Sequence, residues 1–125
     1  MRISDSFGGG LHPVPVVTFS TAGRGNCVTV AGMPYVYART AQGAFVMPAR
    51  CPHRGGPLHL ARIGPNGRQL VCPWHERGVS LSRLRQEVPA VRRGDLVTAV
   101  FAGAFDTGAE PQVEYRPLSP DLSIC

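Results

Sequence analysis

The chain has 125 residues, enough for one compact domain but too few for a second hydrophobic core beside it. Its 13 basic residues are all arginine, and the formal net charge is +5. No apolar run is long enough to span a bilayer, and residues 1–10 lack the apolar stretch of a secretory signal. We therefore expect a small cytoplasmic protein, with neither a membrane nor a nucleic acid as partner.

Short β-prone runs separated by turn signals follow one another along the chain. The turns include Gly64-Pro65-Asn66-Gly67 and Arg93-Gly94-Asp95. No long segment has helical periodicity, although residues 82–87 are expected to form a turn of helix. The pattern predicts an all-β, antiparallel architecture with strands at 14–19, 27–30, 33–39, 44–47, 69–72, 79–81, 96–101 and 112–115.

Composition divides the chain near residue 102. Most arginines lie between residues 50 and 93, whereas residues 95–125 hold five acidic residues against Arg116, and the last part is rich in Gly and Pro. We expect residues 1–102 to form the domain. Residues 103–125 are then either a tail packed on the sheet or an extension from it.

Two short loops carry the residues suited to metal binding. Cys51-Pro52-His53 has Cys-x-His spacing, and Cys72-Pro73-Trp74-His75 has Cys-x-x-His spacing. Each loop supplies one thiolate and one imidazole, which suits a two-iron cluster with both cysteines on one iron and both histidines on the other. The alternative is a structural zinc ion, because two Cys and two His are also a common zinc set.

The mixed ligand set has an electrostatic consequence. With two thiolates and two neutral imidazoles, an oxidised two-iron, two-sulfide cluster is formally neutral, whereas four thiolates leave it dianionic. An electron adds more easily to the neutral centre, and His ligation accordingly raises the potential to about −150 to +300 mV. The ligand set favours a mild electron carrier.

Residues 51–58 and 72–75 resemble the two cluster loops of Rieske proteins, especially the small ferredoxins that serve bacterial oxygenases. The resemblance implies a Rieske-type antiparallel β-sandwich, with loops 51–58 and 72–76 in a small cluster-binding subdomain at one tip. It implies a [2Fe–2S] cluster held by Cys51, His53, Cys72 and His75. The expected role is to carry single electrons from a reductase to a terminal oxygenase or related enzyme.

Two features depart from the family pattern. Glu76 stands where Gly usually follows the second ligand histidine, so the tight turn there lacks its usual residue. We expect Glu76 to point into water, the alternative being that its charge lowers the potential. High-potential members carry an extra Cys in each loop, where this chain has Gly56 and Trp74. Both features predict a potential in the lower half of the Rieske range.

The remaining Cys and His residues are expected to have no metal role. Cys27 should be a small core residue and Cys125 an exposed thiol, while His59 should cap a loop or face solvent. An oxygenase also needs a mononuclear iron site of two His and one carboxylate. Only His12 and His59 remain outside the cluster loops, and the chain is too short for the domain that holds such a site. We expect an electron carrier without catalytic residues of its own.

Three residues near the ligands have alternative readings. Trp74 is expected first to pack and exclude water, and Arg54 and Arg77 either guide an acidic partner or form a solvated charged rim.

The alternative function is a zinc- or cluster-stabilised binding module, a redox sensor, or a small subunit of an oxidoreductase complex.

Overall fold

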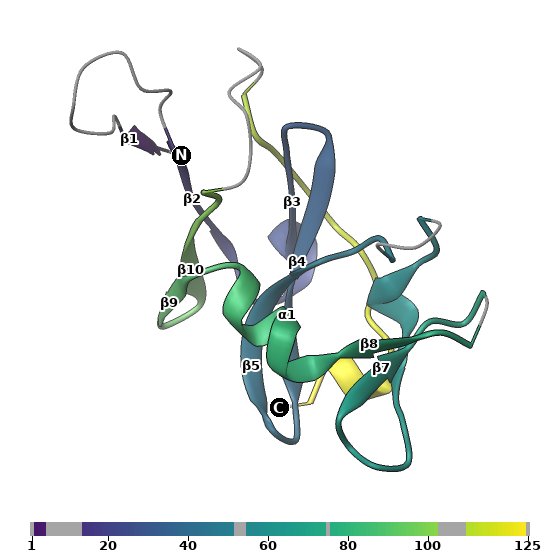
Figure 1. The fold of residues 1–125 in the computed structure, drawn as a ribbon. Coiled ribbons are helices and arrows are strands. Elements are labelled where there is room, and N and C mark those ends of the chain that lie inside the picture. The colour runs from purple at the N-terminus through teal and green to yellow at the C-terminus, as the bar shows by residue number, and fades with distance from the viewer. Residues whose placement is uncertain (1, 5–13, 52–54, 75, 103–109, 125) are drawn as a thin grey trace.

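The computed structural model describes residues 2–4, 14–51, 55–74, 76–102 and 110–124. Within them, three antiparallel sheets surround two hydrophobic core clusters (Figure 1). The outer sheet has the order β1 (Arg2–Ser4), β2 (Val14–Ser20), β10 (Leu96–Val100) and β9 (Ala90–Arg93). The central sheet has the order β11 (Gln112–Glu114), β3 (Cys27–Val30), β4 (Met33–Thr40) and β5 (Gly43–Pro48). The small sheet has the order β6 (Arg62–Ile63), β7 (Gln69–Val71) and β8 (Gly78–Ser80).

Four short helices complete the described structure. The α-helix α1 (Leu81–Glu87) follows β8 directly, and the Ser80 side chain caps it by accepting a hydrogen bond from the Arg83 N–H. The 3-10 helices are η1 (Gly23–Gly25), η2 (Leu58–Leu60) and η3 (Pro120–Leu122).

The central sheet is buried on both faces. Because successive side chains of a strand point to opposite faces, Tyr37 and Val46 face the outer sheet, whereas Val36 and Met47 face the side that carries the small sheet. The strands of this sheet are therefore apolar almost throughout, and each face contributes to a separate core cluster. The central sheet therefore lies between the outer sheet and the small sheet.

The outer sheet is buried on one face only. Val17 and Phe19 of β2 are buried, whereas Thr18 lies on the opposite face and its hydroxyl is 2.7 Å from that of Thr98 on β10. This alternation of apolar and polar side chains is typical of an antiparallel sheet with one solvated face. The two sheets together form the expected sandwich.

The segment after residue 109 packs on the domain. β11 pairs with β3, and Leu122 of η3 is fully buried in the core beneath the central sheet. The Asp121 carboxylate accepts a hydrogen bond from the Ile63 N–H at 2.8 Å, and the Ile124 N–H donates to the Arg39 carbonyl at 3.0 Å. These contacts favour the packed tail over the extension, while the boundary at residue 102 stays a prediction.

The all-β prediction is confirmed, and each predicted strand is present to within one residue at either end. The sequence pattern missed β1, β6 and β9. β6 is only two residues long, and all four residues of β9 are exposed, so neither has a recognisable alternation. Among the residues described, no helix combines the length and apolar character needed to cross a membrane.

Candidate metal centre

The two Cys/His loops are built in the same way. An isolated bridge pairs Arg50 with Pro57 around loop 51–56, and the β7–β8 register pairs Val71 with Gly78 around loop 72–77. A cysteine is the first residue inside each pair. The described parts of these two segments are thus arranged alike, although the sequence has no repeat, and Figure 1 shows them on the side of the molecule that carries β7 and β8.

Backbone hydrogen bonds repeat from one loop to the other. The Cys51 N–H donates to the Gly56 carbonyl at 2.7 Å, and the Cys72 N–H donates to the Arg77 carbonyl at 2.9 Å. In return, each cysteine carbonyl accepts a bond of 2.9 Å from the residue four positions later, Gly55 or Glu76. Both loops are therefore closed tightly at their cysteine.

The similarity of the two cysteine loops also explains two unusual backbone angles. Gly55 has φ of 71° and Glu76 has φ of 53°, and both stand four residues after the loop cysteine. The loop geometry requires a left-handed residue there, which glycine adopts freely and glutamate does not. The tight turn is therefore formed at Glu76, although glycine is the usual residue at this position.

Both cysteines are buried in the same core. Cys51 is 5% exposed and Cys72 is 1% exposed, and both belong to the cluster beneath the central sheet. The loops also touch, because a Cβ placed on Gly56 would lie only 2.8 Å from Cys72 Sγ and 3.3 Å from Trp74 Cβ. The glycine thus keeps the space beside the Cys72 thiol open.

The other half of the predicted ligand set lies outside the described residues. These are His53 and His75, and Arg54 is also among the residues not described. The described part of the chain accordingly holds no group of three potential metal-binding side chains. The structure brings the two cysteine loops together, and the assignment of the histidines stays a prediction.

Glu76 has a partner that the sequence did not reveal. Its carboxylate lies 2.6 Å from Arg62 Nη2, and the two side chains are 68% and 54% exposed respectively. The predicted exposure is confirmed, but Arg62 offsets the negative charge and ties the second loop to β6. Such a pair between distant positions has no local sequence signal.

The predicted packing role of Trp74 is wrong, and of the two alternatives for His59, exposure to solvent is wrong, whereas its hydrogen bond just before the first cysteine loop fits the other. Trp74 is 62% exposed, so it packs over Gly56 only in part and presents most of its surface to solvent. His59 is 8% exposed, and its Nδ1–H donates to the Ala49 carbonyl at 3.1 Å. Burial lowers the pKa of His59, against the opposing effect of that hydrogen bond.

Cys27 lies in the core, as predicted. It is fully buried on β3, and burial raises the pKa of its thiol to about 11. The thiolate form is therefore absent near neutral pH, which fits a packing role.

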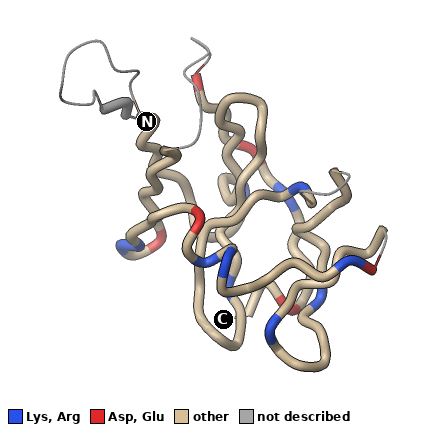
Figure 2. The backbone as a smooth tube through the Cα atoms, viewed as in Figure 1, with Lys and Arg blue, Asp and Glu red and all other residues tan. Residues whose placement is uncertain are grey.

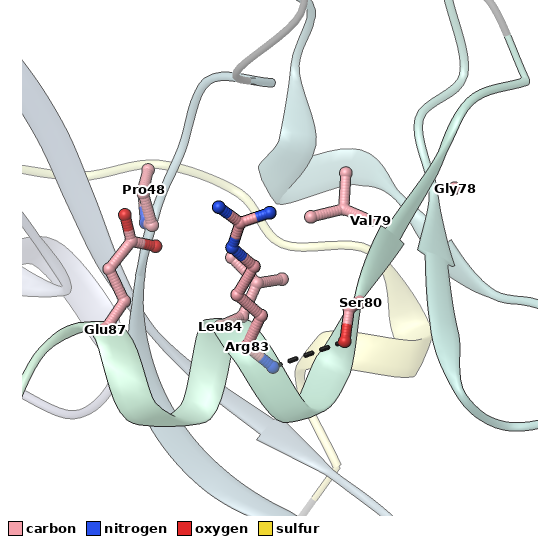
Figure 3. Close-up of a pocket in the computed structure, with 7 residues that line it drawn as sticks. All are labelled: Pro48, Gly78, Val79, Ser80, Arg83, Leu84 and Glu87. Carbon is pink, nitrogen blue, oxygen red and sulfur yellow. Dashed lines mark hydrogen bonds between the residues drawn. The ribbon is translucent and has the colours of Figure 1, made fainter.

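A cavity of about 380 Å³ lies between β5, β8 and α1. It is lined by Pro48, Gly78, Val79, Ser80, Arg83, Leu84 and Glu87. Figure 3 shows the Arg83 guanidinium projecting from α1 between Val79 and Glu87. Arg83, Arg50 and Arg77 are exposed. Figure 2 shows several basic positions along the backbone of this part of the molecule, with fewer acidic ones.

An antiparallel sandwich with a small sheet that presents two cysteine loops defines the class of protein. The sequence model of the Rieske [2Fe-2S] domain family matches residues 13–101, and the chain belongs to this family. A human Rieske domain-containing protein is 50% identical over 38 residues, which cover 29% of this chain and 24% of the human protein. The chain therefore aligns with about a quarter of that relative. No solved structure matches the chain.

The family's cofactor is a [2Fe–2S] cluster. The described side chains fit it, because two buried thiols begin two equivalent, touching loops and Gly56 leaves room beside Cys72. The Rieske fold with its cluster-binding subdomain, inferred above from the loop motifs, is confirmed.

Proposed function

We propose that this protein is a Rieske-type ferredoxin that carries single electrons to a partner enzyme, with Cys51, His53, Cys72 and His75 as the cluster ligands. The equivalence of the two loops carries the proposal. Each loop buries one cysteine and, two or three residues later, has one histidine in its sequence. A matched pair of Cys/His loops suits one shared two-iron centre better than two separate sites.

When bound, the cluster supplies a one-electron couple, with a potential of about −150 to +300 mV for His-ligated clusters. The protein supplies two thiolates, excludes water from both, and fixes each cysteine by backbone bonds on either side. Because Arg62 offsets the charge of Glu76, we base the expected low potential mainly on Gly56 and Trp74 standing where high-potential proteins have cysteines.

Metal and sulfide analysis tests the ligand assignment. We expect two irons and two acid-labile sulfides per chain, lost on replacing Cys51, His53, Cys72 or His75 by Ala. Cys27→Ala is the matched control, since it removes an equally buried thiol that lies on β3 and outside both loops. Full zinc occupancy in protein made with ample iron, or loss of iron in the control alone, would contradict the assignment.

For partners, we propose a reductase and a terminal oxygenase or related redox enzyme in the cytoplasm, each with an acidic docking surface. The exposed arginines beside the loops support this, because opposite charges accelerate association. The chain's own part is electron transfer, so the substrate is bound and oxidised on the partner.

Stopped-flow electron exchange with a candidate reductase tests the docking charge. The rate should fall as salt rises, since exposed charges are screened beyond about 10 Å at 0.1 M salt. Arg77→Gln should flatten this dependence, whereas Arg93→Gln on β9, outside the small sheet, should leave it unchanged. A salt-independent rate, or equal effects of both variants, would exclude steering by the loop arginines.

A further inference from the structure

Arg39 occupies an unusual place between the outer and central sheets. It follows Tyr35 and Tyr37 on the same face of β4, and those two rings pack in the core between the sheets. Arg39 continues this inward-facing row at the β4–β5 turn, the end of β5 opposite to the first cysteine loop. A cationic side chain thus ends a row of aromatic core residues.

The Arg39 guanidinium is incompletely paired. Its Nε is buried and, within the described residues, is the one buried side-chain nitrogen or oxygen without a hydrogen-bond partner. The ion pairs of that part of the chain are Arg62–Glu76 and Arg116–Glu114, and neither includes Arg39. A buried donor without an acceptor is unfavourable by about 1–3 kcal/mol, and more when it is charged, so Arg39 lowers the stability of the fold at this position.

A cavity of about 360 Å³ adjoins Arg39. Its wall consists of Arg39, Thr40, Gly43, Ala44, Arg92 and Ile124. Arg92 comes from β9 of the outer sheet and uses its Nε to donate to the Gly94 carbonyl at 2.9 Å, so its other guanidinium nitrogens remain for a ligand. The cavity is therefore lined by one arginine from each of two sheets, Arg39 and Arg92, and no acidic residue is in its wall.

We propose that this cavity is a binding site for a phosphate group, held between Arg39 and Arg92. Two arginines match the charge of a dianionic phosphate, and the planar guanidinium fork donates paired hydrogen bonds to its oxygens. An anion in the cavity would offset the positive charge of the partly buried Arg39. The site is independent of the cluster, because its residues lie on β4, β5 and β9 and not in the cysteine loops.

Calorimetric titration of the full-length, cluster-loaded protein with inorganic phosphate tests the proposal, in a buffer whose ionic strength is held constant with NaCl. We expect one phosphate per chain. Arg39→Met and Arg92→Gln should each weaken binding by about tenfold or more, the loss expected for a charge-assisted hydrogen bond. Arg93→Gln is the control, because Arg93 is exposed next to Arg92 and does not line the cavity.

A second readout separates a ligand site from a structural role. Without phosphate, Arg39→Met should unfold at the same urea concentration as the wild type or a higher one, since it removes a buried, unpaired donor. With phosphate, only the wild type and Arg93→Gln should gain stability beyond the general effect of the salt. Three results would overturn the proposal: no phosphate binding to the wild type, unchanged affinity in Arg92→Gln, or equal weakening in Arg93→Gln. If Arg39→Met does not fold, the affinity of Arg92→Gln still decides the question.

Discussion

At the scale of single residues, Glu76 shows how a loop accepts an unfavourable side chain. Its φ of 53° is strained for any residue other than glycine, asparagine or aspartate, by roughly 1–2 kcal/mol. Its ion pair with Arg62 is exposed, and such pairs contribute only about 0–1 kcal/mol. The backbone strain therefore outweighs the ion pair.

This comparison predicts the order of stability of three proteins. Glu76→Ala keeps the strain and loses the ion pair, whereas Glu76→Gly loses both. Glu76→Gly should be more stable than Glu76→Ala by about 1 kcal/mol and at least equal to the wild type. Urea unfolding followed by circular dichroism measures this order, and equal midpoints for the two variants would show that the turn is not strained.

His59 gives a prediction on pH. Because burial lowers its pKa in the folded protein, the unfolded chain takes up a proton first as the pH falls through about 6.5. The contribution of His59 to stability is therefore complete above that pH and decreases below it. His59→Asn keeps a donor for the Ala49 carbonyl but does not titrate.

The wild type should thus lose more stability than His59→Asn between pH 7 and pH 5, as measured by urea midpoints at each pH. All other titrating groups are shared, so the difference between the two slopes reports His59 alone. Parallel slopes would mean that His59 titrates alike in both states.

At the scale of elements, the close contact between the two cysteine loops requires glycine at position 56. A methyl group on Gly56 would lie 2.8 Å from Cys72 Sγ, whereas one on Gly64 would meet Val71 at an ordinary 3.4 Å. Neither glycine has positive φ, so alanine is tolerated by both backbones.

Gly56→Ala should therefore reduce the iron bound per chain and destabilise the protein by about 1–3 kcal/mol, the usual effect of overpacking. Gly64→Ala should change neither quantity. Iron content and urea midpoints of both variants provide the test; full iron content in Gly56→Ala would show that the loops do not need this close approach.

The packed C-terminal segment yields a second prediction on this scale. Leu122 is fully buried beneath the central sheet, whereas Ile124, two residues later, is 40% exposed. Leu122→Ala should lower the free energy of unfolding by about 2–5 kcal/mol, and Ile124→Ala by less than about 1 kcal/mol. Similar small effects would indicate that η3 contributes little to the domain.

At the scale of the whole molecule, the sequence predicted most of what is local. The short β-prone runs predicted the antiparallel strands, and the resemblance of the two loops to Rieske proteins predicted the sandwich. The fold brings the Cys51 and Cys72 loops together, while the ligand roles of His53 and His75 stay a prediction. Contacts between distant segments were missed: the Arg62–Glu76 pair, the burial of His59 and the exposure of Trp74 all depend on how the small sheet packs. The edge strand β9 was missed because pairing with β10, and not burial, holds it.

The proposed centre is one cluster held by two cysteines and two histidines. Pulsed EPR of the dithionite-reduced protein tests it most directly, with protein grown on ¹⁵N-labelled histidine as the comparison. We expect couplings to two histidine nitrogens that change with the label. Coupling to no histidine nitrogen, or to only one in the wild type, would contradict it.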